Sequence, residues 1–260
     1  MRKFIKIETM IGCNAHCLFC PMGAGILKRK RGQMSTDFFF KIVDQAVALG
    51  FDVSAFFMNE PLMEPRIFEF FDYLRGLGKK QRLSTNAGAI TKEVARRLSQ
   101  YQYESFSISF HGGNKKDYEK VMGLNFEESI SNIKYLISLQ AIPNYVISMK
   151  ITEENKNSVN AFKDLWKGYK FNVGKAINWA GSLGKGPGIS RCRVLGIPCV
   201  FWDGRMPLCC LDAEGKAIVG DLRELSLKEV LSGKIYQTYF DFNNRNKLHE
   251  LYPCSACDRE

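Results

Sequence analysis

Hydrophobic residues along this chain occur in short runs that are separated by longer amphipathic stretches. The short runs, rich in β-branched and aromatic residues, predict strands at 3–9, 53–58, 82–85, 105–110, 145–150 and 171–177. The amphipathic stretches, two of them opened by a Ser or Thr cap, predict helices at about 36–49, 66–77, 91–99, 126–139 and 156–167. Strands that alternate with helices in this way form parallel β–α units with the helices outside. Right-handed crossovers would curl these units into a partial (β/α)6 barrel, an α/β fold.

The alternation of strands and helices stops near residue 180. A glycine-rich segment at 180–190 predicts a linker, and short strands and a helix at about 226–240 follow it. We therefore expect a core domain over residues 1–180 and a linker with a small cysteine-rich domain over 181–260. No apolar run approaches the roughly 18 residues that span a bilayer, and the N-terminus is too polar for a signal peptide. We expect a cytoplasmic protein with no membrane partner.

The nine cysteines of the chain gather in two places. Three lie within 13–20 and six within 192–257, with none between 21 and 191. A reducing cytosol disfavours disulfides, and disulfide frameworks rarely leave so long a gap. The distribution therefore predicts two separate metal sites.

Cys13, Cys17 and Cys20 form the first of these sites, in the loop that follows the first predicted strand. Ligands of such barrels bind at the C-terminal ends of the strands, where this loop lies. Three thiolates on a [4Fe–4S] cluster leave one iron without a protein ligand and open to a substrate. A zinc site would need a fourth ligand, for which the chain offers only a weak candidate, His16.

The spacing Cys-x3-Cys-x-aromatic-Cys, with Phe19 as the aromatic residue, resembles the signature of radical S-adenosylmethionine (radical SAM) enzymes. In that family the open iron binds the amine and carboxylate of SAM, and an electron from the cluster cleaves a C–S bond to yield a 5′-deoxyadenosyl radical. The resemblance covers roughly residues 3–180. It implies that Phe19 lies at the cofactor and that a reducing electron donor such as flavodoxin or ferredoxin is a partner.

Polar residues at the ends of the next three strands resemble further parts of the SAM site of this family. Glu60, in "MNEP", matches the acid that holds the SAM amine, although Asn59 stands where a glycine is usual. Asn86, in "STNAG", resembles a contact near SAM, and Ser107 and Ser109, in "SISFHGG", resemble the serine that approaches the ribose. The resemblance implies that these residues bind the cofactor, while each one alone could also serve as a turn or cap.

His111 stands in the same segment, at a position where aspartate is common in the family. Oxidation of an alcohol needs a proton acceptor, and a histidine after a strand end is well placed to face a substrate. We take His111 as the candidate catalytic residue. The alternative is a histidine that packs or caps a turn.

The second metal site lies in the C-terminal part of the chain, where the segment 203–221 resembles the SPASM and twitch auxiliary-cluster domains of radical SAM enzymes. Six cysteines suit the shorter, one-cluster twitch arrangement with two cysteines left over. The resemblance implies four ligands of a second [4Fe–4S] cluster: Cys192, Cys209, Cys254 and Cys257. A four-cysteine zinc site is the alternative.

Cys199 and Cys210 are the two cysteines left over. Cys199 falls inside a predicted strand, and Cys210 would point away from Cys209 if the next strand continued that far. Either could be a small buried hydrophobe. Either could instead donate a hydrogen atom to a substrate radical.

A fully ligated second cluster has no open iron, so its natural use is electron transfer. With this cluster as electron acceptor, hydrogen abstraction becomes a two-electron oxidation, the reaction of the 2-deoxy-scyllo-inosamine dehydrogenase type, which the chain resembles in architecture and length. The resemblance implies a radical SAM oxidoreductase that dehydrogenates a small polar molecule such as a cyclitol or sugar alcohol. The same domains occur in maturases that crosslink or epimerise ribosomally made peptides, which is the alternative. Because the first predicted strand starts at residue 3, we expect no N-terminal peptide-recognition domain, which favours the small molecule, although a separate protein could recognise a peptide leader.

The formal net charge of +10 raises the question of nucleic-acid binding. Two clusters with their thiolates would lower the net charge to about +7. The basic run "KRKR" at 28–31 is expected to be a solvated loop, and no basic stripe is interleaved with aromatic residues. Nucleic acid is therefore the less favoured partner, behind a small molecule or a peptide.

Overall fold

The computed structural model of the chain describes residues 3–259 and divides into two compact units. The first unit comprises the chain up to Ile11, the segment Gly25–Asn59, and the chain from Ile177 onward. The second unit comprises Gly12–Ala24 and Glu60–Ala176. Neither unit is continuous in sequence, and the domain boundary expected near residue 180 stays a prediction.

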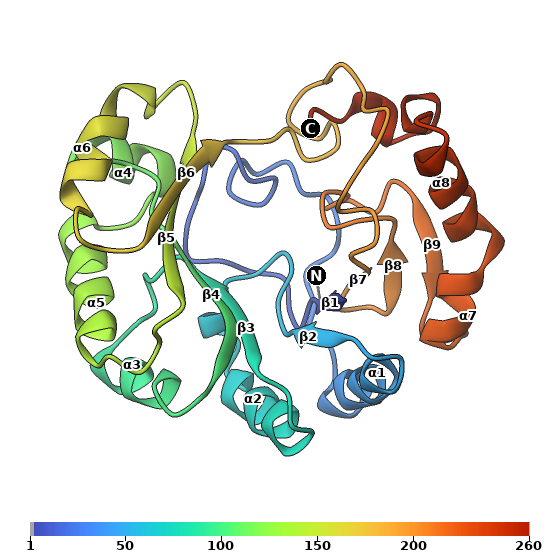
Figure 1. Cartoon of the computed structure of the whole chain (residues 1–260), viewed down its shortest axis with the longest axis horizontal. Helices are drawn as coiled ribbons and strands as arrows, with labels where there is room; N and C mark the ends of the chain where they lie inside the picture. The colour runs from blue at the N-terminus through green and yellow to red at the C-terminus, as the bar shows by residue number, and fades with distance from the viewer. Residues whose placement is uncertain (1–2, 260) are drawn as a thin grey trace. The chain divides into compact units, whose positions relative to one another are not determined.

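The second unit is built on a parallel sheet with helices along one face (Figure 1). The strands follow chain order: β3 (Gln81–Thr85), β4 (Tyr103–Ser109), β5 (Tyr145–Ile151) and β6 (Phe171–Lys175). The helices are α2 (Ile67–Gly76), α3 (Lys92–Leu98), α4 (Lys115–Met122), α5 (Phe126–Ser138) and α6 (Val159–Leu165), with 3₁₀ turns at Pro61–Met63 and Lys156–Ser158. Along β4 the apolar residues Phe106 and Ile108 are buried while the serines between them are partly exposed, so the sheet keeps a polar face.

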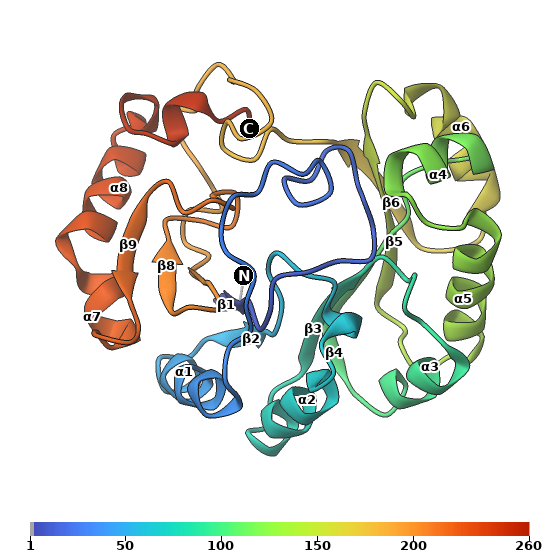
Figure 2. The ribbon, with the colours of Figure 1, turned by 180° about the vertical axis from the view of Figure 1, so that it is seen from behind.

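The first unit contains a short parallel sheet in the order β2 (Asp52–Ser54), β1 (Phe4–Ile7), β7 (Cys199–Val200). It also holds the antiparallel hairpin β8 (Arg205–Pro207) and β9 (Ile218–Asp221). Its helices are α1 (Thr36–Ala48), α7 (Leu227–Ser232) and α8 (Lys234–Asn244), which Figure 2 shows from behind, with 3₁₀ turns at Leu248–Glu250 and Cys254–Ala256. Ser35 caps α1, since its side chain accepts a hydrogen bond from the Phe38 N–H.

The pairing of β7 with β1 joins the C-terminal part of the chain to the first strand. The Lys6 N–H donates to the Pro198 carbonyl at 3.0 Å, and the Glu8 N–H donates to the Val200 carbonyl at 2.8 Å. β1 is therefore a central strand, and Ile5 is fully buried. This pairing could not be predicted, because a strand as short as β7 carries no readable periodicity.

Several elements differ from the sequence-based prediction. The strand expected over 53–58 ends at Ser54, and the Asn59 side chain then accepts a hydrogen bond from the Phe57 N–H and closes a turn. The helix expected over 226–240 is two helices, because Gly233 adopts an extended conformation between them. The charged helix α4, capped by Asn114, was not predicted. Among residues 3–259, none of the helices has the length and apolar character needed to cross a bilayer.

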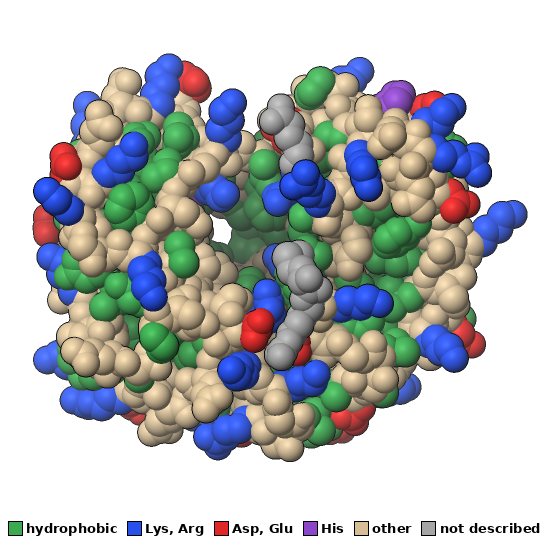
Figure 3. Space-filling view, in the orientation of Figure 1, with side chains coloured by type: hydrophobic (Ala, Val, Ile, Leu, Met, Phe, Trp, Pro, Cys, Tyr) green, Lys and Arg blue, Asp and Glu red, His purple; other side chains and the backbone are tan. Residues whose placement is uncertain are grey.

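A buried ion pair in the first unit corrects the expectation that residues 28–31 form a fully solvated loop. The Arg29 side chain is 4% exposed and donates to both carboxylate oxygens of Glu8, at 2.9 and 2.8 Å. Arg29 also donates to the Ala213 carbonyl at 2.6 Å, and its guanidinium lies 3.6 Å from the centre of the Phe201 ring. The other basic residues of this run are exposed. On the face shown in Figure 3, lysine and arginine side chains of the described residues are scattered rather than gathered in one stripe.

Candidate active site

The loop with the three N-terminal cysteines lies in the second unit and is closed by its own backbone. The Cys20 N–H donates to the Cys17 carbonyl at 3.0 Å, and the Ala24 N–H donates to the Cys20 carbonyl at 2.8 Å. A β-carbon at Gly23 would lie 2.4 Å from both the nitrogen and the oxygen of Cys17, so only glycine fits this position. The loop is also tied to the end of α4, where the His16 N–H donates to the Met122 carbonyl at 2.8 Å.

The three thiols of this loop share a partly buried environment. Burial raises the pKa of Cys13 to about 11 and also raises the pKa of Cys17 and of Cys20. The neighbouring thiols Cys20 and Cys13 raise the pKa of Cys17 further, which shows that the three sulfurs lie within electrostatic reach of one another.

Backbone N–H groups point at these sulfurs and favour their thiolate forms. The Ala15 N–H donates to Cys13 Sγ at 3.4 Å, and the N–H groups of Met22 and Gly23 lower the pKa of Cys20 against the effect of burial. A cationic cluster would supply the remaining charge compensation. The residues present therefore fit a [4Fe–4S] cluster held by three thiolates. The His16 side chain, the weak fourth ligand of the zinc alternative, lies against Gly123.

Glu60 is held deep in the second unit, at the start of the 3₁₀ turn Pro61–Met63. It is 3% exposed and accepts hydrogen bonds from Thr85 Oγ1 at 2.6 Å and from the Leu62 N–H at 3.2 Å. Burial raises the pKa of this carboxyl group to about 7. A ligand ammonium group beside it would restore its full negative charge. This environment suits the expected contact with the SAM amine, which stays a prediction.

Asn86 lies between Glu60 and the cysteine loop. Its backbone N–H donates to Glu60 Oε2 at 2.8 Å, and its side-chain Nδ2 donates to Cys13 Sγ at 3.4 Å and to Asn14 Oδ1 at 2.8 Å. Its Oδ1 accepts from the Gly88 N–H at 2.8 Å. The sequence pointed to Glu60, Asn86 and Cys13 separately, and the structure brings them into contact. Asn14 was missed, although its place directly after Cys13 in the loop was a signal.

Ser107 and Ser109 lie on the polar face of β4, opposite the buried residues of that strand. Ser107 Oγ lies 3.3 Å from Ser148 Oγ on β5. Both serines are partly exposed, so their hydroxyl groups remain accessible to a ligand. Their expected contact with the ribose stays a prediction.

His111 is 5% exposed and packs directly against the cysteine loop. The Phe19 ring meets the His111 ring edge-on, with 4.9 Å between their centres. The backbone N–H of Lys150 donates to His111 Nδ1 at 3.0 Å, which places the ring proton on Nε2. Burial, reinforced by the Lys150 charge, lowers the pKa of His111 to about 3. The imidazole is therefore neutral, and its role as a proton acceptor stays a prediction.

The four C-terminal cysteines expected as ligands lie together in the first unit. Burial raises the pKa of Cys254 to about 12, and the neighbouring Cys192 and Cys257 add to this rise. Burial also raises the pKa of Cys209, with Cys254 among the contributing neighbours. The other three thiols therefore lie within electrostatic reach of Cys254, as ligands of one cluster must. These residues fit an auxiliary [4Fe–4S] cluster.

Contacts missed by the sequence analysis hold this second set of cysteines. Asn243 of α8 accepts from the Cys192 N–H at 2.7 Å and donates to the Cys192 carbonyl at 3.2 Å. The glycine-rich segment pairs with the C-terminal turn, since the Gly188 N–H donates to the Cys257 carbonyl at 3.1 Å. Asn178 binds the same turn through its Nδ2, 2.7 Å from the Ala256 carbonyl. Glycines in the segment permit this close approach of two backbones.

Cys199 and Cys210 are both buried. Cys199 lies on β7 with 0% exposure, and the nearby Cys210 thiol raises the pKa of Cys199 beyond the effect of burial. β8 ends at Pro207, so Cys209 and Cys210 lie beyond the strand and the alternation argument does not apply to them. Their environment suits small buried hydrophobes, and their roles stay predictions.

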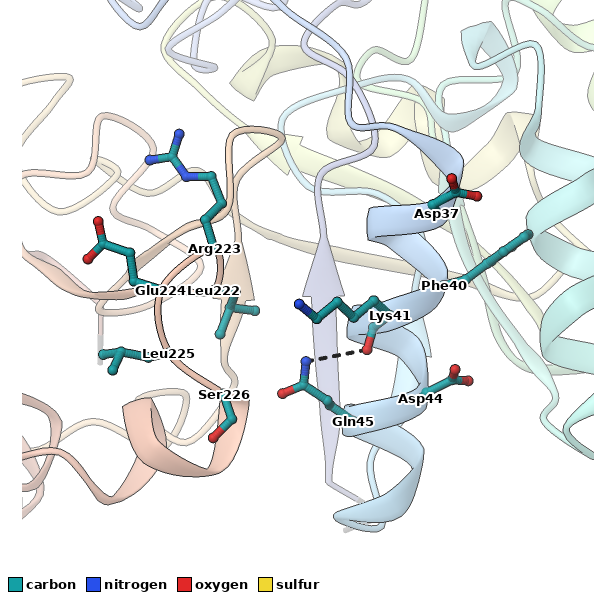
Figure 4. Close-up of a pocket in the computed structure, with 10 residues that line it drawn as sticks. All are labelled: Asp37, Phe40, Lys41, Asp44, Gln45, Leu222, Arg223, Glu224, Leu225 and Ser226. Carbon is teal, nitrogen blue, oxygen red and sulfur yellow. Dashed lines mark hydrogen bonds between the residues drawn. The ribbon is translucent and has the colours of Figure 1, made fainter.

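A cavity of the first unit lies apart from these residues. It has a volume of about 750 Å³ and lies between α1 and the segment 222–226 (Figure 4). Gln45 of α1 lines it, with Nε2 donating to the Lys41 carbonyl at 3.4 Å and Oε1 accepting from the Leu227 N–H. None of the residues expected at a cofactor lines this cavity.

Comparison with known protein families decides what these two cysteine sites belong to. The pattern that describes the Radical SAM superfamily matches residues 7–165. The chain belongs to this superfamily. A second pattern, SPASM, described as an iron–sulfur cluster-binding domain, matches residues 192–258. The predicted fold class is thereby confirmed, with a radical SAM α/β domain followed by a small cysteine-rich domain.

Similar proteins include a heme synthase and a mycofactocin maturase. The AdoMet-dependent heme synthase of Methanosarcina barkeri is 27% identical over 52% of this chain and 39% of its own length. The mycofactocin maturase MftC of Mycobacterium tuberculosis is 28% identical over 62% of this chain and 41% of its own length. The matched segments thus cover about two fifths of these relatives.

Solved structures share the fold of the chain. BtrN in complex with AdoMet and 2-DOIA has a TM-score of 0.69 at 16% identity, over 100% of this chain and 94% of BtrN. Streptococcus suis SuiB bound to its precursor peptide SuiA has a TM-score of 0.75 at 15% identity, over 99% of this chain and 70% of SuiB. The cofactors of this radical SAM enzyme are SAM and two [4Fe–4S] clusters.

Proposed function

We propose that this radical SAM enzyme is an oxidoreductase that dehydrogenates a small polar molecule such as a cyclitol or sugar alcohol. The observation that carries the proposal is the second set of cysteines, Cys192, Cys209, Cys254 and Cys257, which lies within the SPASM match at residues 192–258. Four protein ligands leave no open iron, so such a cluster serves electron transfer rather than SAM binding. An internal electron acceptor is what a dehydrogenation needs.

The residues of the second unit would bind and orient the cofactor. When bound, SAM and its cluster supply a 5′-deoxyadenosyl radical that takes a hydrogen atom from a substrate C–H bond. Cys13, Cys17 and Cys20 would hold the cluster, and Glu60 would pair with the SAM ammonium group in a site that excludes water. Ser107 and Ser109 would offer hydroxyl groups to the ribose from the polar face of β4.

Dehydrogenation of an alcohol requires loss of a hydrogen atom, an electron and a proton. The auxiliary cluster would accept the electron, and His111 is our candidate for the residue that accepts the proton. For His111 to accept it, Nδ1 must first release the Lys150 N–H that it binds at 3.0 Å. Substrate binding near the Phe19–His111 contact would break this hydrogen bond and free Nδ1 to accept the proton.

Maturation of a ribosomally made peptide is the second candidate function. It is supported by the likeness to MftC in sequence and by the likeness to peptide-bound SuiB in fold. The small-molecule proposal is supported by BtrN, whose structure with 2-DOIA matches nearly the whole of both chains. The two functions share every residue named above and differ in the substrate.

The deciding experiment measures 5′-deoxyadenosine formed by the reduced, cluster-loaded protein with SAM and host extract, split into small-molecule and peptide fractions. The proposal expects stimulation by the small-molecule fraction and a product lighter by two hydrogen atoms. A variant with Cys13, Cys17 and Cys20 changed to Ala is the matched control and should form no 5′-deoxyadenosine. Stimulation by the peptide fraction alone would reject the dehydrogenase and support the maturase. The same assay with flavodoxin or ferredoxin in place of a chemical reductant tests the proposed electron donor.

A further inference from the structure

The sulfur of Cys13 receives two hydrogen bonds, one local and one distant in sequence. The local donor is the Ala15 N–H at 3.4 Å. The distant donor is the Asn86 side chain, whose Nδ2 also lies 3.4 Å from the sulfur. A side chain from the end of β3 thus reaches back to a cluster ligand within the second unit.

Further hydrogen bonds hold the Asn86 side chain in this orientation. Its Nδ2 is shared with Asn14 Oδ1 at 2.8 Å, its Oδ1 accepts from the Gly88 N–H at 2.8 Å, and its backbone N–H is bound to Glu60 at 2.8 Å. A β-carbon at Gly88 would lie 2.7 Å from Asn14 Nδ2 and 3.1 Å from Asn86 Oδ1, so glycine leaves the two amides the space that they occupy. An amide held so firmly donates to the sulfur in one fixed geometry.

Hydrogen bonds to the sulfurs are among the factors that set the reduction potential of an iron–sulfur cluster. Reduction adds one electron from an external reductant to the cluster, and no bond forms or breaks. The added negative charge strengthens a hydrogen bond donated to a ligand thiolate, so the bond stabilises the reduced form more than the oxidised form. A donor to Cys13 therefore makes the cluster easier to reduce.

We propose that Asn86 is a positioning residue that raises the reduction potential of the SAM-binding cluster through its hydrogen bond to Cys13. Its second contact, with Glu60, joins the expected anchor of the SAM amine to a cluster ligand through one residue. This role is distinct from a direct contact with SAM and holds for either substrate class.

The test is the midpoint potential of the SAM-binding cluster, measured by redox titration with electron paramagnetic resonance detection. Asn86→Ala removes the donor and should lower the equilibrium constant for reduction roughly tenfold, which corresponds to ~59 mV for a one-electron couple. Asn86→Asp keeps the size of the side chain and an acceptor for Gly88, but replaces the donor with a negative charge. It should lower the potential further than Asn86→Ala.

Asn144→Asp is the matched control. Asn144 lies in the same unit, is exposed, and donates its side-chain N–H to the Tyr103 carbonyl at 2.7 Å, away from the cysteine loop. The midpoint potential of the SAM-binding cluster in Asn144→Asp should equal that of the wild type. The order wild type above Asn86→Ala above Asn86→Asp, at equal iron content, supports the proposal. Unchanged potentials, or failure of both Asn86 variants to hold the cluster, would overturn it in favour of a purely structural role.

Discussion

Replacement of Arg29 by methionine tests what the buried ion pair does for the stability of the first unit. Methionine keeps much of the length of the side chain and its packing on Phe201, but removes the charge and the donors. Glu8 is fully buried and would keep only backbone partners, among them the Trp202 N–H at 3.3 Å. The variant therefore isolates the cost of an uncompensated buried carboxylate.

The expected cost follows from the protonation of Glu8. Burial raises the pKa of Glu8 above the usual value of 4.5 and Arg29 opposes this rise, so removal of Arg29 raises it further. The folded protein then binds a proton that the unfolded chain releases, and stability falls as pH increases from 4.5 towards the raised pKa. Each pH unit in this window costs about 1.36 kcal/mol. Protonation thus caps the electrostatic cost at about 1.4 kcal/mol at pH 5.5 and about 4.1 kcal/mol at pH 7.5.

The upper figure agrees with the ~3–5 kcal/mol typical of a broken buried ion pair. Loss of the hydrogen bond to the Ala213 carbonyl adds about 0.5–1.5 kcal/mol that does not depend on pH. The destabilisation caused by Arg29→Met should therefore grow by up to about 2.7 kcal/mol between pH 5.5 and pH 7.5.

The assay is anaerobic urea unfolding of the cluster-loaded protein, followed by far-ultraviolet circular dichroism at the two pH values. Arg31→Met, at an exposed position of the same loop, is the control and should change stability little. Addition of Glu8→Gln to Arg29→Met should recover most of the loss at pH 7.5. A destabilisation that is equal at both pH values, or that Glu8→Gln fails to relieve, would refute the account based on a buried charge.

Three further predictions concern the clusters and the sheet of the first unit. Gly23→Ala places a β-carbon 2.4 Å from the Cys17 backbone, so the variant should fail to hold the SAM-binding cluster. Colorimetric iron counting should then find about half of the roughly eight irons expected per chain. Cys254→Ala should lose the other half, the auxiliary cluster, while Cys210→Ala should keep both; equal iron in the two variants would contradict the ligand assignment. A chain cut after residue 180 loses β7 and exposes the edge of β1, so it should aggregate on size-exclusion chromatography, whereas a monodisperse fragment would show that this pairing is dispensable.

Local sequence patterns can predict the elements that depend on the type and spacing of neighbouring residues. The cysteine loop was found from the spacing of Cys13, Cys17 and Cys20, because a cluster fixes how closely its ligands follow one another. The strands of the second unit were found because burial of one face imposes a period of two on β4 and its neighbours. The candidates Glu60 and Asn86 were found because the segments that hold them resemble motifs of the radical SAM family.

The features that escaped prediction depend on residues far apart in the chain. Arg29 lies in a basic run that local pattern assigns to solvent, and only its meeting with Glu8 and Phe201 makes burial of its charge tolerable. The contact of Asn86 with Cys13 is likewise absent from any window of the sequence.

The sequence by itself determined the chemistry of this protein: the cluster-binding loop, the second set of cysteines, and the alternation of strands and helices. The loop and the alternation depend on short-range spacing and periodicity, and the second set of cysteines was identified by its resemblance to auxiliary-cluster domains. Tertiary structure decided which polar groups are buried and what each one meets, including the hydrogen bond from Asn86 to Cys13 and the pairing of β7 with β1. The physical reason is that the cost of burying a charge or a hydrogen-bonding group depends on its partners in space, and folding alone brings those partners together.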